Sequence, residues 1–275
     1  MIKILALATC YNRKEKTLKA INNLISGNPG IKFRFIIADD NSTDGTGQAL
    51  SKIPEVKVVF GDGNSYYTGG MRIAMAEALE RLKNAQKPDY IMLFNDDVDF
   101  YDGAIEGLIA KGRKDMILVG PTCEKDGTTL SYGGVKRKSN FRPKFLKVKA
   151  DKGRVFEVDT FNANCVLIPT DLFIKTGNMD KVYNHSLGDF DYGYMLRRNG
   201  GRIYVSDEYV GICPFNSDEG TWNDTGLSRR ERIKKKESIK GVPFGEFFHY
   251  LLKNYNILTA IIYSFSPYIR ILIGK

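Results

Sequence analysis

Apolar and polar positions follow two different periods over the first hundred residues. Short, almost unbroken apolar runs, which are typical of buried strands, occur at residues 2–8, 33–38, 56–60 and 90–94. Residues 14–26 and 70–82 instead place apolar side chains three and four positions apart, as on one face of a helix. Because strands alternate with helices, the pattern predicts an α/β fold. Its sheet should be largely parallel and Rossmann-like, with ligands binding beyond the carboxyl ends of the strands.

The second half of the chain is less regular. Further strands and helices are predicted at residues 116–119, 164–168, 171–176, 191–199 and 202–205. Residues 132–154 carry many basic side chains with little apolar periodicity, which indicates a hairpin or a mobile loop. A chain of 275 residues can form one large domain with an appendage, or two small domains.

The chain changes character at residue 226. A charged stretch at residues 229–236 precedes an aromatic and aliphatic segment at residues 244–273. The apolar part of this segment is short and contains Pro267 and Arg270, so it makes a poor membrane span. We therefore expect residues 226–275 to be a helical C-terminal extension. It could lie on a membrane surface, or it could pack on the main domain or on another subunit in a homo-oligomer.

Charge is distributed unevenly along the chain. The formal net charge is +9, but residues 136–154 carry nine basic residues and one acidic residue, and residues 226–275 carry ten and three. The remaining residues are therefore net acidic, which favours a local anionic partner such as a lipid surface. The basic residues flank an apolar tail and no aromatic recognition surface, so we expect no nucleic-acid partner.

Four scattered cysteines and the N-terminal sequence bear on the cellular compartment. The cysteines show no metal-thiolate spacing, and three of them lie in or beside apolar runs. A strand begins directly at the N-terminus, without the features of a signal peptide. These observations predict a reduced, cytoplasmic setting.

Polar turns follow three of the predicted strands, at residues 9–13, 39–45 and 95–99. In a parallel sheet these turns should converge at one edge. A carboxylate such as Asp40 can accept N–H groups of a base or ribose hydroxyls, and a helix N-terminus suits a diphosphate, so together they predict a nucleotide pocket. The adjacent Asp96 and Asp97 repel each other unless a cation or strong donors intervene, which leaves either a divalent metal site or a solvated turn.

Five motifs occur in a fixed order along residues 1–215: Ala8-Thr-Cys-Tyr-Asn-Arg13, Asp39-Asp-Asn-Ser-Thr-Asp44, Tyr67-Thr-Gly-Gly-Met-Arg72, Asn95-Asp-Asp97 and Gly188-Asp-Phe-Asp-Tyr192. In this order they resemble the inverting family 2 glycosyltransferases, and most closely the bacterial rhamnosyl- and galactofuranosyltransferases of surface polysaccharides such as O-antigen and capsule. The resemblance implies a GT-A glycosyltransferase domain over residues 1–225, a nucleotide-diphosphate sugar donor and a Mg²⁺ or Mn²⁺ ion.

The same resemblance implies roles for individual residues. Asp97 would be the main metal ligand, and Asp189 would be the general base that accepts the proton of the acceptor hydroxyl. Donor-binding residues would be Thr9, Asn12, Arg13, Asp40, Gly69, Gly70, Arg72 and Asp96. Weaker candidates for acceptor contacts are Asn164, His185, Asp191 and Trp222, although Asp191 suits helix capping or a supporting contact better, and Trp222 suits ordinary packing equally well.

One departure from the family pattern concerns the metal. Many relatives place a metal-binding histidine after the strand that follows the Asp189 helix, but residues 210–214 contain none. The third protein ligand therefore stays open, with Asn216 or water as alternatives, and weak or absent metal dependence is a second alternative.

The predicted function is transfer of a hexose, deoxyhexose or furanose from a UDP- or dTDP-sugar to a growing glycan. We expect that glycan to be carried on a polyprenyl diphosphate at the cytoplasmic face of the plasma membrane. Two alternatives remain at this point. One is a sugar nucleotidyltransferase, although the first strand is not followed by a Gly-rich, lysine-containing loop. The other is a noncatalytic polysaccharide-assembly subunit.

Overall fold

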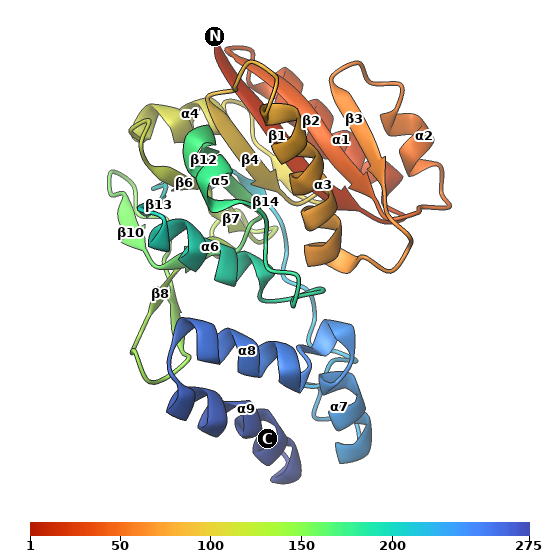
Figure 1. The fold of residues 1–275 in the computed structure, drawn as a ribbon, viewed down its shortest axis with the longest axis vertical. Helices are drawn as coiled ribbons and strands as arrows, with labels where there is room; N and C mark the ends of the chain where they lie inside the picture. The colour runs from red at the N-terminus through yellow and green to blue at the C-terminus, as the bar shows by residue number, and fades with distance from the viewer.

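The computed structural model describes residues 1–275, and its centre is one eight-stranded mixed sheet (Figure 1). From one edge to the other its strands are β10 (Phe156–Val158), β13 (Ile203–Val205), β6 (Ile117–Val119), β12 (Cys165–Pro169), β4 (Tyr90–Phe94), β1 (Ile2–Cys10), β2 (Ile31–Asp39) and β3 (Val56–Phe60). The strands β1 to β4 run parallel, β13 runs parallel to β6, and only β12 and β10 are antiparallel to their neighbours. The predicted α/β fold with a largely parallel sheet is confirmed.

Helices cover both faces of this sheet. They are α1 (Lys14–Gly27), α2 (Thr46–Leu50), α3 (Tyr66–Leu82), α4 (Ala104–Lys111), α5 (Thr170–Thr176) and α6 (Gly188–Arg198). Apolar side chains of α1, α2 and α4 pack in one core cluster, and those of α3, α5 and α6 pack in another. On β1, Ile4, Ala6 and Ala8 belong to the first cluster while Leu7 belongs to the second, because side chains alternate across a strand. The sheet is therefore buried on both sides.

Two small sheets complete the main body. One contains β11 (Thr160–Phe161), β8 (Gly134–Arg137) and β9 (Phe145–Lys147), so the predicted basic excursion is a hairpin. The other contains β5 (Asp99–Phe100), β14 (Gly211–Ile212) and β7 (Thr122–Cys123). Because β14 pairs with β5, it brings residue 213 beside the acidic cluster at residues 95–99.

The C-terminal extension is helical, as predicted, and consists of α7 (Arg229–Lys236), a short 3₁₀ helix (Ile239–Gly241), α8 (Phe244–Asn254) and α9 (Ile257–Leu272). It lies below the main body in Figure 1, where α8 runs alongside α6. Tyr250 and Leu251 of α8 share a buried cluster with Tyr183 and Tyr194. One of the two predicted alternatives, packing on the main domain, therefore holds for α8. No helix combines the length and apolar character that a bilayer crossing requires.

Candidate active site

The loops that follow β1 and β2 are joined by the side chain of Asn12. Its Oδ1 accepts a hydrogen bond from the backbone N–H of Thr43 (2.8 Å), and its own N–H donates to Ser42 Oγ (2.9 Å). Asn12 has a φ of 51°, a left-handed conformation that asparagine tolerates better than most residues. The two polar turns therefore converge at one edge of the sheet, as the parallel pairing of β1 with β2 requires.

Arg13, the residue that precedes α1, pairs with both carboxylates of the acidic pair after β4. Arg13 Nη1 lies 3.2 Å from Asp96 Oδ1 and 2.9 Å from Asp97 Oδ2. Asp96 is buried and also accepts from Thr17 Oγ1 at 3.1 Å. Burial raises the pKa of Asp96 to about 6, the nearby Arg13 lowers it, and the charge of Asp97 raises it. Arg13 thus offsets the repulsion between the two carboxylates.

The donor atoms around Asp97 determine what kind of metal site this edge can form. No cluster of three His, Cys, Asp or Glu side chains is arranged to hold an ion, and the Cys213 thiol donates to Asp97 Oδ1 at 3.7 Å near the expected histidine position. The side-chain oxygen of Asn95 is buried without a hydrogen-bond partner. Mg²⁺ is commonly bound by one or two carboxylates together with substrate phosphates, so this set fits a cation whose coordination the donor diphosphate completes. Metal use and the role of Asp97 stay predictions.

Asp189 lies in the first turn of α6, which begins three residues before the predicted helix. The preceding Leu187 has a left-handed φ of 66°, and Gly188 packs so closely on Thr68 that an added Cβ would approach its Cγ2 to 2.2 Å. The carboxylate accepts from the backbone N–H groups of Phe190 (2.8 Å) and Ala163 (3.3 Å). No ion pair of the chain includes Asp189, and burial raises its pKa to about 6. A carboxylate of this kind can accept a proton near neutral pH.

The segment at residues 162–164 connects Asp189 to the acidic cluster. Ala163 donates to Asp189, and the next residue, Asn164, accepts the backbone N–H of Asn95 at 3.2 Å. Asn164 Nδ2 also lies 3.4 Å from Cys213 Sγ, the same thiol that reaches Asp97. Asn164, a predicted acceptor contact, is therefore placed between the two carboxylates that carry the predicted chemistry.

Tyr67 is a site residue that sequence reasoning did not single out. Its phenol oxygen is buried and has no hydrogen-bond partner. Burial raises the pKa of Tyr67 well above its usual range, and the charges of Asp189, Asp97 and Asp96 raise it further. The phenol therefore lies in the electrostatic field of both carboxylate groups. The available signal was its position at the start of the Tyr67–Arg72 motif, from which only the two glycines and the arginine were predicted to bind the donor.

Several predicted donor-binding residues make contacts within the protein. Thr9 Oγ1 donates to Ala38 O (3.1 Å), and Gly70 lies so close to Thr9 that an added Cβ would approach Oγ1 to 2.0 Å. The buried carboxylate of Asp40 accepts the backbone N–H groups of Gly63 (2.9 Å), Ser65 (2.9 Å) and Tyr66 (3.2 Å). These contacts shape the loops of the site, and direct contact with a nucleotide stays a prediction for all three predicted residues.

Gly69 and Arg72 hold the loop that precedes α6. The backbone N–H of Gly69 donates to Asn184 O at 3.1 Å, and the Arg72 guanidinium donates to the carbonyl of Tyr183. Arg72 uses one of its five N–H donors on this carbonyl, and its predicted contact with phosphate or sugar stays a prediction. His185 lies in the same loop, with its ring edge-on to Tyr66 at a centroid distance of 6.2 Å. Burial lowers the pKa of His185, so its imidazole is neutral at pH 7.

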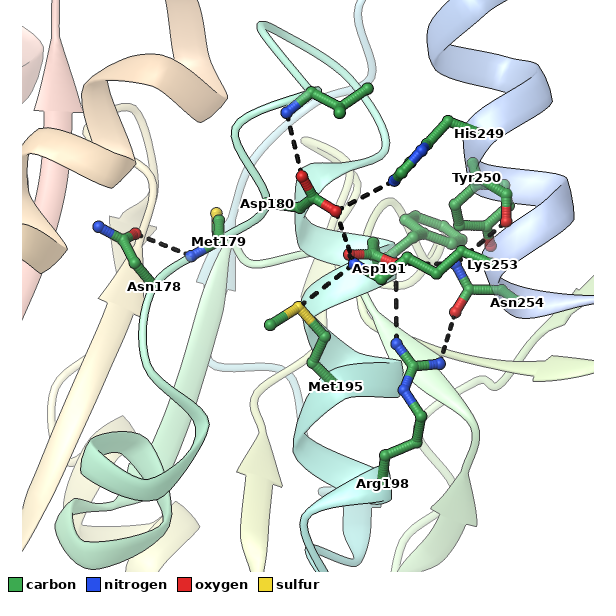
Figure 2. Close-up of polar contacts among 12 residues, drawn as sticks. Asn178, Met179, Asp180, Asp191, Met195, Arg198, His249, Tyr250, Lys253 and Asn254 are labelled. Atoms are coloured by element: carbon green, nitrogen blue, oxygen red, sulfur yellow. Dashed lines mark hydrogen bonds and ion pairs between the residues drawn. The ribbon is translucent and has the colours of Figure 1, made fainter.

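Two predicted acceptor residues lie elsewhere. Asp191 is buried and faces α8, where its oxygens accept from Lys253 Nζ (2.7 Å) and Asn254 Nδ2 (2.8 Å), as Figure 2 shows. Trp222 contacts α7 and α9: its carbonyl accepts from Arg232, and the Arg270 guanidinium lies 5.8 Å from its ring centroid. Neither residue contacts Asp97 or Asp189, and their acceptor roles stay predictions. Asp191 has the supporting role that was its alternative.

The fold is that of a GT-A glycosyltransferase. A sequence model described as Glycosyl transferase family 2 matches residues 6–167, which is more than half of the chain, and the chain belongs to this family. A comparison with curated protein sequences found no match.

Solved structures with the same fold share little sequence with this chain. TarS from S. aureus is 14% identical with a TM-score of 0.56, over 92% of this chain and 43% of TarS, so the chain spans less than half of that protein. A structure of TarS residues 1–349 gives a TM-score of 0.58 at 14% identity, and the match covers 98% of this chain and 81% of that fragment. The mannosyltransferase PcManGT from Pyrobaculum calidifontis, in complex with GDP-Man and Mn²⁺, gives a TM-score of 0.55 at 12% identity. This match covers 98% of this chain and 73% of PcManGT.

Proposed function

We propose that this protein is an inverting glycosyltransferase that moves a sugar from a nucleotide-diphosphate donor to a hydroxyl of a bacterial surface glycan. The observation that carries this proposal is the pairing of Asp189 with the Asp96–Asp97 cluster through residues 162–164. A carboxylate without a cationic partner stands at one end of this segment, and a carboxylate pair with a bound arginine stands at the other. These are the two functions that glycosyl transfer needs, a proton acceptor and a site for a departing diphosphate.

The side chains of the site have separate roles in the proposed reaction. Asp189 accepts the proton of the acceptor hydroxyl as that oxygen attacks the anomeric carbon. Arg13 and the loop after β1 supply positive charge and N–H groups where the diphosphate departs. A Mg²⁺ or Mn²⁺ ion on Asp97 would supply further charge stabilisation to the diphosphate. A single in-line displacement of this kind inverts the anomeric configuration.

The identity of the donor and acceptor extends this proposal. We infer a UDP- or dTDP-sugar as donor. GDP-sugars are tested beside them because a structural neighbour was solved with GDP-Man. We infer a glycan carried on a polyprenyl diphosphate at the cytoplasmic face of the membrane as acceptor, because two basic segments accompany the otherwise acidic chain.

The nature of the released product tests this function against its enzymatic alternative. We expect the purified protein to release a nucleoside diphosphate from one class among UDP-, dTDP- and GDP-sugars, with faster release when Mn²⁺ is added. Coupled detection of nucleoside diphosphate and of pyrophosphate, in parallel reactions, makes the measurement. Release of pyrophosphate from a nucleoside triphosphate and a sugar phosphate would indicate a nucleotidyltransferase. Nucleotide binding without any turnover, across all donors with glycan acceptors present, would indicate a noncatalytic subunit.

A further inference from the structure

The last helix, α9, exposes most of its large apolar side chains, with Ile271 an exception, while several of its small or polar side chains are buried. Thr259, Ala260 and Ser264 are buried against the protein. Leu258 is 68% exposed and Ile262 is 61% exposed. The exposed apolar residues, which we call the outer face of α9, recur at helical spacing and are Ile257, Leu258, Ile261, Ile262, Phe265, Ile269, Leu272 and Ile273. An ordinary surface helix shows the opposite arrangement, so this face is suited to a partner with an apolar interior.

The β8–β9 hairpin extends this surface at the start of α9. Thr259 Oγ1 donates to the carbonyl of Phe141, at the tip of the hairpin, at 3.0 Å. The Phe141 side chain is 70% exposed. Arg137, the last residue of β8 before the tip, donates to Asn254 O (2.8 Å) and stacks on the Tyr255 ring, 3.9 Å from its centroid. Figure 1 shows the hairpin reaching down from the main body to the C-terminal helices. The basic excursion and the C-terminal extension, distant in sequence, therefore meet.

Cations lie near this apolar surface at the hairpin and on α7. The tip of the hairpin carries Lys138, Arg142 and Lys144. An open pocket of about 530 Å³ beside the tip is lined by Arg137, Asn140, Asp159, Tyr194, Arg197, Arg198 and Asn254. Helix α7, which is tied to the end of the chain by a bond from Arg232 to Lys275 O (2.6 Å), exposes Arg229, Arg230, Lys234 and Lys235. An apolar face with positive charge nearby matches the interfacial layer of an anionic bilayer.

We propose that the outer face of α9 and the tip of the β8–β9 hairpin together form a surface that docks on an anionic lipid bilayer. A second copy of the chain is a poorer occupant, because a symmetric dimer through this face would bring these cations close to their copies. Lipid offers both an apolar interior and negative headgroups to one surface.

Docking through α9 would also orient the active site. Helix α8 packs against α6. Its residues Lys253 and Asn254 bind Asp191 of α6, which lies two residues from Asp189. The C-terminal helices therefore lie between the docked lipid and the helix that presents the proposed base. Removing residues 226–275 would strip Asp191 of these partners, so deletion of the extension would confound docking with folding. Point substitutions on the outer face avoid this difficulty.

The test measures binding of the full-length protein to vesicles of phosphatidylcholine with and without phosphatidylglycerol, at low and moderate salt. We expect binding to the phosphatidylglycerol vesicles that weakens with salt, and a loss of roughly tenfold or more in the partition coefficient for the double variant L258Q/I262Q. The variant R142Q/K144Q should lose affinity only for the anionic vesicles. Ile174→Gln, which changes a side chain 37% exposed on α5, is the matched control and should bind as the wild type does.

Two results would overturn lipid docking. One is equal vesicle binding by the wild type and by L258Q/I262Q. The other is a wild-type dimer in sedimentation equilibrium that becomes a monomer in L258Q/I262Q, because a second copy would then occupy the face. Lipid docking and sugar transfer can fail separately: Asp189→Asn should bind vesicles like the wild type, and L258Q/I262Q should keep the nucleoside-diphosphate release of the wild type in solution.

Discussion

Replacing Asp189 with Asn should lower kcat for sugar transfer by about a thousandfold while leaving nucleotide binding within about twofold of the wild type. The amide keeps the shape of the side chain, and its single oxygen can still accept one of the two N–H groups, from Ala163 or Phe190, that the two carboxylate oxygens accept, but it cannot take the hydroxyl proton. Since burial places the pKa of Asp189 at about 6, the wild-type rate should fall as the pH is lowered through that value and the base becomes protonated. The variant's residual rate should lack this dependence.

Initial rates of transfer from pH 5 to 8 and calorimetric titration with the nucleoside diphosphate make these measurements. Asp191→Asn removes the same charge two residues further along α6 and is the matched control, because Asp191 faces α8. The folded fraction of that variant should transfer sugar with the wild-type pH profile. An Asp189→Asn variant that retained full activity would remove Asp189 as the base, and a wild-type profile that stayed flat below pH 6 would contradict its raised pKa.

Asp191→Asn should in turn produce the largest loss of stability among conservative changes at the α6–α8 interface. The Asp191 side chain is 1% exposed, and the change leaves Lys253, 26% exposed, with Asp180 as its remaining carboxylate. Breaking one partner from a buried ion pair typically costs about 3–5 kcal/mol, and the partial exposure of Lys253 places this case near the lower value, about 3 kcal/mol. For a chain of this size that corresponds to a fall of about 6–10 °C in Tm.

Thermal unfolding followed by circular dichroism measures this loss. Asp171→Asn provides the comparison, because Asp171 also pairs with a lysine, Lys87 at 2.7 Å, but its side chain is 85% exposed. That exposed pair should contribute little, so the Tm of Asp171→Asn should stay within about 1 °C of the wild type. Equal Tm values for the two variants would show that α8 does not depend on Asp191 for its attachment to α6.

The elements that could be predicted from the sequence are those whose pattern is local. Residues 2–8 and 90–94 are apolar on both faces because β1 and β4 lie inside the sheet, and such runs are visible without knowledge of their neighbours. The strands β10 and β14 pair with distant segments and lack the apolar run that made the short strands β6 and β13 predictable. Their sequences carry too few residues for a period, so they were not predicted. The short helix α4 was missed for the same reason.

The candidate site also has features that the sequence could predict and features that it could not. The strand-end position of Asp97 follows from the local pattern, and the family motif marks Asp189, although the local pattern predicted the helix only from residue 191. The partners of these residues follow from neither: Arg13 reaches Asp97 across 84 positions, and Lys253 reaches Asp191 across 62. A motif identifies a carboxylate but not the charge that faces it. For Asp191 the sequence favoured capping or a supporting contact over an acceptor role, but only the packing of α8 shows which groups bind its carboxylate.

The most direct test of the account is a crystal structure of the Asp189→Asn variant with an intact donor sugar and Mn²⁺. We expect anomalous scattering from Mn²⁺ at the Asp97 carboxylate, the donor diphosphate beside Arg13, and the anomeric carbon facing the side chain at position 189. A diphosphate bound away from Asp97, or a sugar whose anomeric carbon faces a different part of the protein, would contradict this expectation.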